Sequence, residues 1–136
     1  MSAPIPYLHL PGTARDALEF YRNVFGGELE LRTHAEAGTD QAPSDAIAHG
    51  RLYGLVDLYA ADAAPDQAAG GTGATMLALF GTAEPSTLRT WFVSLADGGE
   101  VVEELQRRPW GASDGQVRDR FGVLWLIGYE HGTGQS

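Results

Sequence analysis

Two histidines and an arginine stand inside predicted strands, at positions where their side chains would share a face with other polar groups. His9 falls in the predicted strand 4–10, and His49 and Arg51 fall in the predicted strand 46–52. Side chains alternate between the two faces of a strand, so His49 and Arg51 should point the same way. Imidazole titrates near neutral pH, so two histidines facing one concavity would suit a ligand site or a general base. For each histidine alone, a structural hydrogen bond is the alternative.

Trp110 and Arg118 are candidates from the second half of the chain. The Trp110 ring offers a flat surface on which a planar ligand could stack, and core packing is the alternative. The guanidinium of Arg118, like that of Arg51, suits a carboxylate or phosphate. For Arg118 the alternative is a cross-strand ion pair with Glu104 or with the neighbours of Asp119. The predicted ligand-binding residues are therefore His9, His49, Arg51, Trp110 and Arg118, and no catalytic residue is assigned.

The composition excludes several kinds of chemistry. The 136 residues contain no cysteine, which removes disulfides, thiolate catalysis and cysteine-ligated metals. All nine basic residues are arginine, and the net charge of −9 disfavours binding to a nucleic-acid backbone. No apolar run is long enough to cross a membrane, and the first residues lack the pattern of a secretory signal. These features predict a cytoplasmic protein whose partner is a small molecule, with no nucleic acid and no membrane involved.

Two glycine-rich motifs do not support catalysis. Gly111–Gly115 matches G-x-S-x-G, but that nucleophile elbow needs a strand before the serine and a helix after it. Here a strand, 116–120, is predicted to follow. Gly70–Gly73 resembles a phosphate loop, yet it precedes a strand and lacks the lysine of that motif. It is interpreted as part of a linker.

The first half of the chain predicts one helix among four strands. Apolar residues at helical spacing begin at Ala14, Thr13 and Asp16 could form a capping box, and Gly26-Gly27 should end the helix. The predicted strands are 4–10, 28–34, 46–52 and 55–61, and the segment 35–45 is predicted to be a loop.

The second half repeats this order. Its predicted helix is 84–96, and the Gly-Gly-Glu that ends the first helix recurs at Gly98–Glu100. Its predicted strands are 74–80, 100–106, 116–120 and 123–129. The pattern predicts an α+β fold of two βαβββ modules. We expect a single domain, 1–136, with module one at about 4–61, a linker at 62–73 and module two at about 74–130.

Several motifs resemble a known family. The βαβββ repeat with ALEFYRNVFGG at Ala17–Gly27 resembles the glyoxalase/bleomycin resistance/dioxygenase superfamily, also called vicinal oxygen chelate. Arg108–Gly111, followed by DRFGVLW at Asp119–Trp125, resembles its PhnB-like branch, together with PYL at 6–8 and AH at 48–49. Proteins of that branch are often labelled as similar to a demethylubiquinone 3-methyltransferase. The resemblance runs from about residue 4 to residue 130.

This resemblance implies a U-shaped, mostly antiparallel eight-stranded sheet around a cavity, often within a homodimer. In enzymatic members, His, Gln or Glu residues from the first and last strands of the modules hold a divalent metal, which polarises substrate oxygens. The corresponding positions here fall near Ile5, within 74–80 and at Leu126, and none carries such a side chain. No metal and no cofactor are therefore predicted.

Two functions remain open at this point. The first is a metal-independent protein that binds a small molecule in its sheet cavity. The alternative is a metal-dependent lyase, isomerase or dioxygenase of the same superfamily, with a relocated site that uses His9 and His49, and Asp57 as a conceivable third ligand. Imidazoles on opposite faces of the sheet would exclude that relocated site. A methyltransferase is not supported, because the chain lacks a glycine-rich strand–loop–helix for an adenosyl cofactor.

Overall fold

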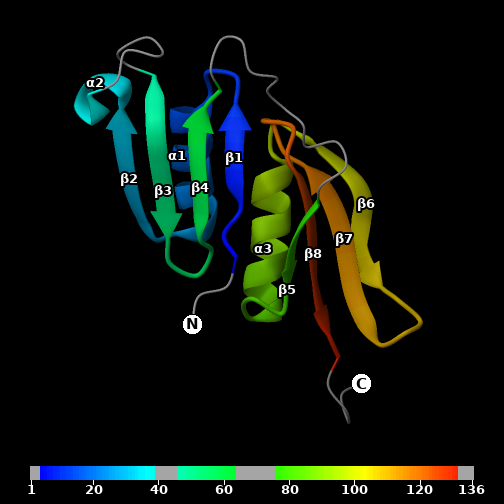
Figure 1. Ribbon diagram of the computed structural model, residues 1–136. Coiled ribbons are helices and arrows are strands. Elements are labelled where there is room, and N and C mark those ends of the chain that lie inside the picture. Colours follow the sequence, from blue (N-terminus) through cyan, green and yellow to red (C-terminus); the bar gives the residue numbers. More distant parts are fainter. Residues whose placement is uncertain (1–3, 39–45, 64–75, 132–136) are drawn as a thin grey trace. The chain divides into compact units, whose positions relative to one another are not determined.

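The computed structural model describes residues 4–38, 46–63 and 76–131, and the chain divides into two compact units, Met1–Gly71 and Thr72–Ser136 (Figure 1). Each unit contains one module of the predicted kind. The first module ends with a strand that runs to Asp62, one residue later than expected. Most of the predicted linker 62–73 lies outside the described residues, and the single domain stays a prediction.

The first unit is a four-stranded sheet with helix α1 on one face (Figure 1). Its elements, in chain order, are β1 (Tyr7–Leu10), α1 (Ala14–Phe25), β2 (Glu28–Thr33), α2 (His34–Ala37), β3 (Ile47–Tyr53) and β4 (Leu58–Asp62). The strand order is β1-β4-β3-β2, with β1 parallel to β4 and the other pairs antiparallel. The short α2 lies in the segment predicted to be a loop, and a capping box between Thr33 and Glu36 explains its start.

The second unit repeats this topology (Figure 1). Its elements are β5 (Met76–Phe80), α3 (Pro85–Ala96), β6 (Glu100–Arg107), β7 (Ala112–Arg118) and β8 (Leu124–Glu130). The order is β5-β8-β7-β6, with β5 parallel to β8. Strand β7 begins four residues before the predicted start at 116. Its first half, ASDG, has turn-like composition, but pairing with β6 and β8 on both sides holds it in a strand.

These elements confirm the predicted α+β class and the duplicated βαβββ pattern. The eight strands form two four-stranded sheets of mixed direction, each belonging to one module. Each sheet has the same single parallel pair, between the first and last strand of its module. No helix in the described part of the chain is long and apolar enough to span a membrane.

The helices supply the core on one side of each sheet. Along α1, Ala14, Ala17, Leu18, Tyr21 and Phe25 are buried and Val24 is half-buried. Along α3, Leu88, Trp91, Phe92 and Leu95 are all buried. Strand β8 contributes the buried residues Trp125, Ile127 and Tyr129. We call the face of each sheet that points away from α1 or α3 its helix-free face.

The start of α1 is fixed by a distant residue, and the predicted capping box is wrong. Thr13 makes no side-chain cap bond. Instead, the carboxylate of Asp62 at the end of β4 accepts from the backbone N–H of Ala14 at 2.9 Å and from that of Ile47 at 2.8 Å. One carboxylate therefore satisfies the first turn of the helix and the first residue of β3 together.

The repeated Gly-Gly pairs have a common steric cause. The first glycine of each pair, Gly26 or Gly98, has a positive φ, as a helix exit requires. The second glycine of each pair lies against the neighbouring strand. A Cβ on Gly27 would lie 2.5 Å from the carbonyl oxygen of Tyr53, and a Cβ on Gly99 would lie 2.2 Å from the carbonyl oxygen of Arg118. Only glycine allows the next strand to begin so close to its neighbour.

Candidate functional site

Four aromatic side chains form a connected layer on the helix-free face of the first sheet. The Tyr7 ring lies 5.1 Å from His9, 5.9 Å from His49 and 5.7 Å from Tyr59, measured between centroids. The His49 and Tyr59 rings are 5.4 Å apart. The structure therefore brings together His9 and His49, which the sequence left as separate candidates.

Strand alternation explains why these residues face away from α1. In β1, Leu8 and Leu10 are buried, whereas Tyr7 and His9 are exposed. In β3, a Cβ on Gly50 would lie 2.4 Å from Leu18 of α1, so position 50 points at the helix. The neighbouring positions in the alternation, His49, Arg51 and Tyr53, therefore lie on the opposite face.

The strand register aligns these residues in rows. Glu30 pairs with Arg51, Arg51 with Tyr59, and Tyr59 with Tyr7, which makes one row across all four strands. In the next row His9 pairs with Ala61. The small Ala61 side chain places little bulk beside the imidazole of His9. The resulting surface has aromatic rings, imidazole nitrogens and the guanidinium of Arg51, and Arg32 of β2 lies opposite His49 on the same face.

A side-chain hydrogen bond links Tyr7 of β1 to His49 of β3 within this layer. The Tyr7 hydroxyl lies 3.2 Å from Nδ1 of His49, and the direction of donation depends on the tautomer of His49. Partial burial raises the pKa of the Tyr7 phenol above its ordinary value of 10.0. Tyr7 is therefore a neutral phenol at physiological pH, able to donate to His49 or to a ligand.

Arg51 extends the layer through a cation–π contact. Its guanidinium carbon lies 4.4 Å from the centroid of the Tyr53 ring. Ion pairs in the described part of the chain involve Arg108, Arg118 and Arg120, and Arg51 forms none of them. The positive charge of Arg51 is consequently not neutralised by a direct carboxylate contact there.

The equivalent face of the second sheet has different chemistry. By register, Ala78 and Leu126 occupy the positions of Tyr7 and Tyr59, and Gln116 occupies that of Arg51. In the next row Phe80 takes the place of His9, and it is partly exposed. Duplication of the fold has not duplicated the polar aromatic layer, which belongs to the first unit.

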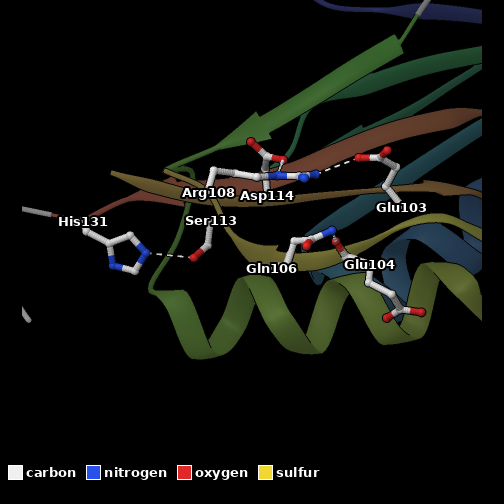
Figure 2. A network of polar contacts seen from close by, with 7 residues as sticks. All are labelled: Glu103, Glu104, Gln106, Arg108, Ser113, Asp114 and His131. Atoms are coloured by element: carbon white, nitrogen blue, oxygen red, sulfur yellow. Dashed lines mark hydrogen bonds and ion pairs between the residues drawn. The ribbon is translucent and has the colours of Figure 1, made fainter. Parts of the chain in front are cut away.

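Trp110 lies in the turn between β6 and β7 and is not a core residue. Its side chain is 70% exposed, and the guanidinium of Arg108 lies 5.9 Å from its ring. Figure 2 shows how Arg108 is held: it contacts Glu103 at 2.7 Å and Asp114 at 2.8 Å. These two carboxylates raise the pKa of Arg108. The exposed Trp110 ring is thus positioned next to an arginine whose charge is already paired.

Arg118 makes an ion pair of the kind weighed from the sequence, but with a different partner. It lies opposite Glu100 in the register of β6 and β7, with 3.9 Å between the nearest nitrogen and oxygen. It also donates to the Gly122 carbonyl at 3.3 Å. Arg118 is partly exposed, so a weak exposed ion pair leaves its charge less neutralised than that of Arg108.

The serine of the G-x-S-x-G motif lies inside strand β7, without the strand–turn–helix of a nucleophile elbow. Ser113 is buried, and its hydroxyl lies 2.8 Å from Nε2 of His131 (Figure 2). The contact joins the start of β7 to the residue that follows β8. His131 is therefore a structural partner of Ser113.

The DRFGVLW motif is a structural turn. Asp119 is 3% exposed and accepts from the backbone N–H groups of Phe121 and Val123 and from the indole N–H of Trp125. Gly122 supplies the positive φ of 86° that the turn needs. The residues that best identified the family in the sequence thus hold the β7–β8 connection together.

The residues do not fit the superfamily's usual metal. The positions at Ile5 and Leu126 carry no His, Gln, Asp or Glu, and neither does any position of 76–80. Asp57, the conceivable third ligand of a relocated site, accepts from the Gly54 backbone N–H at 3.0 Å and so closes the β3–β4 turn. Within residues 4–38, 46–63 and 76–131, no three His, Asp or Glu residues are grouped closely enough to hold an ion.

Two depressions lie elsewhere on the surface. One, of about 480 Å³, is lined by Glu30, Leu31, Arg32 and Glu36 at the β2 edge. The other, of about 330 Å³, lies at the β6–β7 turn and is lined by Arg107, Arg108, Pro109 and Gly111. The first includes Glu30, the cross-strand neighbour of Arg51.

Sequence reasoning missed the tyrosines that complete the layer. Tyr7, Tyr53 and Tyr59 are absent from the predicted site residues, although Tyr7 and Tyr53 each share a strand face with one of those residues. The signal was present in the alternation, since Tyr7 precedes His9 by two positions and Tyr53 follows Arg51 by two. The position of Tyr59 beside both strands required the sheet order.

The duplicated βαβββ topology, together with a polar aromatic sheet face, defines a glyoxalase-like protein. The profile of the Glyoxalase/Bleomycin resistance protein/Dioxygenase superfamily matches residues 10–127. Protein YjdN of Escherichia coli (strain K12) is 31% identical over 137 residues, which cover 90% of this chain and 91% of that protein. The chain therefore belongs to the glyoxalase/bleomycin resistance protein/dioxygenase superfamily.

Solved structures agree with this assignment. Protein PA1353 from Pseudomonas aeruginosa has a TM-score of 0.81 and 31% identity, with 97% of this chain and 100% of that chain covered. The PhnB protein from Bacillus cereus, whose name also carries a 3-demethylubiquinone-9 3-methyltransferase label, has a TM-score of 0.75 and 18% identity. That match covers 96% of this chain and 100% of the other, and it supports the fold.

Proposed function

We propose that this protein binds a small planar molecule on the helix-free face of its first sheet, without the superfamily's usual metal. The observation that carries the proposal is the layer of Tyr7, His9, His49 and Tyr59, in which Tyr7 lies beside the other three rings and His49 beside Tyr59, at centroid distances of 5.1–5.9 Å. Tyr7 is 44% exposed and His9 and His49 are exposed. Exposed aromatic rings with hydrogen-bonding ends are a suitable surface for stacking and orienting a flat ligand.

The proposed ligand-binding residues are His9, His49 and Arg51 of the first unit and Trp110 and Arg118 of the second. The first three lie on the face described above. Trp110 is favoured by its exposed ring and Arg118 by its partly exposed guanidinium. We include in the proposal a homodimer and a cytoplasmic location. Light scattering of the purified chain tests the dimer, and cell fractionation tests the location.

The binding proposal can be tested with a neutral planar probe, 4-hydroxybenzamide. We expect the imidazole resonances of His9 and His49 to shift during an NMR titration, because both rings lie in the layer. His34, which lies at the start of α2, serves as an internal control and should not shift. The variant Tyr7→Ala should weaken the response while its melting temperature stays close to that of the wild type. Unchanged His9 and His49 resonances at millimolar probe would overturn the proposal.

A metal-dependent lyase, isomerase or dioxygenase is the second candidate. It is favoured by one observation: both imidazoles lie on the same face of one sheet, and each ring contacts Tyr7. Elemental analysis of protein purified without chelator separates the two candidates. A stoichiometric divalent metal that is lost in the double variant His9→Gln/His49→Gln would favour the enzyme. Its absence from both proteins would favour the metal-independent binder.

A further inference from the structure

We infer that the ligand carries a carboxylate and that Arg51 binds it, with Tyr53 as the residue that positions Arg51. This inference rests on the proposed binding function and adds the chemical class of the ligand. The guanidinium carbon lies 4.4 Å from the Tyr53 ring centroid, so the aromatic face restrains the arginine without neutralising its charge. A planar guanidinium offers two parallel N–H donors to a carboxylate.

The ion pairs of other arginines show why Arg51 is distinctive. Arg108 is held by two carboxylates, and Arg120 donates to the backbone and side chain of Asp97. Arg118 is paired with Glu100. In the part of the chain that the structure describes, no ion pair joins a carboxylate to Arg51, nor to Arg32, which lies opposite His49 on the same face. Arg51 differs from Arg32 in its contact with the Tyr53 ring, so it is the restrained cation of the aromatic layer that is available to an incoming anion.

Glu30 is the nearest competitor for Arg51. Glu30 in β2 is the direct cross-strand neighbour of Arg51. The guanidinium of Arg51 instead lies over the Tyr53 ring and makes no ion pair with Glu30. The chain also carries a net charge of −9, which repels anions at long range. Removing the Glu30 charge should therefore strengthen carboxylate binding.

The row also sets the length of the ligand. Arg51 lies on β3 and Tyr7 on β1, with Tyr59 of β4 between them. Two strand spacings place the backbones of Arg51 and Tyr7 about 10 Å apart. A single aromatic ring with a carboxylate at one end and a hydroxyl at the other fits this span. The carboxylate would contact Arg51, the ring would stack on Tyr59, and the hydroxyl would reach Tyr7 and His49.

The test compares 4-hydroxybenzoate with its neutral isostere 4-hydroxybenzamide by calorimetric titration of the full chain. We expect the acid to bind the wild type about tenfold more tightly, as a charge-assisted pair should give. Arg51→Gln should abolish this preference by weakening the binding of the acid more than that of the amide. Arg22→Gln, which removes an exposed arginine of α1 on the other side of the sheet, is the matched control and should retain the preference.

Three further variants test the roles of Tyr53 and Glu30. Tyr53→Phe keeps the ring and should keep the preference for the acid, whereas Tyr53→Leu should reduce it about threefold or more. Glu30→Gln should increase the acid affinity about two- to threefold and leave the amide affinity unchanged. Thermal unfolding of each variant checks that the fold is intact.

The outcomes separate the two proposals. Equal affinities of acid and amide for the wild type, with no effect of Arg51→Gln, would overturn the carboxylate inference and leave the binding function standing. A preference for the acid that survives Arg51→Gln would overturn the role of Arg51. Binding of neither probe would overturn the proposed function together with the inference.

Discussion

The Tyr7 hydroxyl lies 3.2 Å from Nδ1 of His49, so a side-chain contact joins β1 to β3 across the strand between them. Tyr59 on the intervening β4 lies beside both rings, at 5.7 Å from Tyr7 and 5.4 Å from His49. The three residues come from positions 7, 49 and 59, and only the sheet order β1-β4-β3 brings them together. This arrangement orients the layer before a ligand binds.

The first prediction concerns this pair as a unit. Tyr7→Phe and His49→Gln should each lower the affinity for 4-hydroxybenzamide about three- to tenfold, the value of one hydrogen bond. The double variant should be little worse than either single variant, because the residues act through a shared contact. Calorimetric titration of the wild type, the two single variants and the double variant measures these affinities. Additive losses would show that the two side chains act independently, and His34→Gln serves as the control.

The second prediction concerns alkaline pH. The pKa of Tyr7 is raised by burial, so the folded state holds this proton to higher pH than the unfolded chain, whose phenol titrates near 10. The contribution of Tyr7 to the free energy of unfolding is therefore fully present below about pH 10. It is lost as the pH rises through the pKa that Tyr7 has in the folded state. Urea unfolding across this range should show a shallower decline in stability for Tyr7→Phe than for the wild type. Parallel declines would contradict the prediction.

The third prediction concerns the turn between β7 and β8. One oxygen of Asp119 accepts from two backbone N–H groups and the other accepts from the Trp125 indole at 2.8 Å. In Asp119→Asn an amide NH₂ would face the indole N–H or the backbone donors, so we expect a loss of about 2–4 kcal/mol in the free energy of unfolding. Urea denaturation measures the loss. Asp97→Asn, at an exposed ion pair, should cost less than about 1 kcal/mol.

The fourth prediction concerns the start of α1. Asp62→Ala removes the acceptor for the backbone N–H groups of Ala14 and Ile47 and should cost about 1–3 kcal/mol of unfolding free energy. Asp16→Ala is the control, because Thr13 and Asp16 form no capping box, and it should change stability by less than about 0.5 kcal/mol. Equal losses in urea denaturation would show that the local cap matters after all.

Much of the fold was determined by local sequence patterns. The apolar faces of α1 and α3, the Gly-Gly exits and the two βαβββ modules all follow from the spacing of neighbouring residues. Ser113 and Asp114 mark the limit of such reasoning. Their composition indicates a turn, but two flanking strands pair with them, and backbone pairing with distant segments outweighs local preference.

The sequence alone determined which side chains of the first unit could do chemistry and on which strand face each would lie. It named His9, His49 and Arg51, because alternation is a property of a single strand. Tertiary structure decided which of these residues meet, since contacts between strands depend on their order and register. That order placed Tyr59 between Tyr7 and Arg51 and assigned Asp62, rather than Thr13, to the first turn of α1.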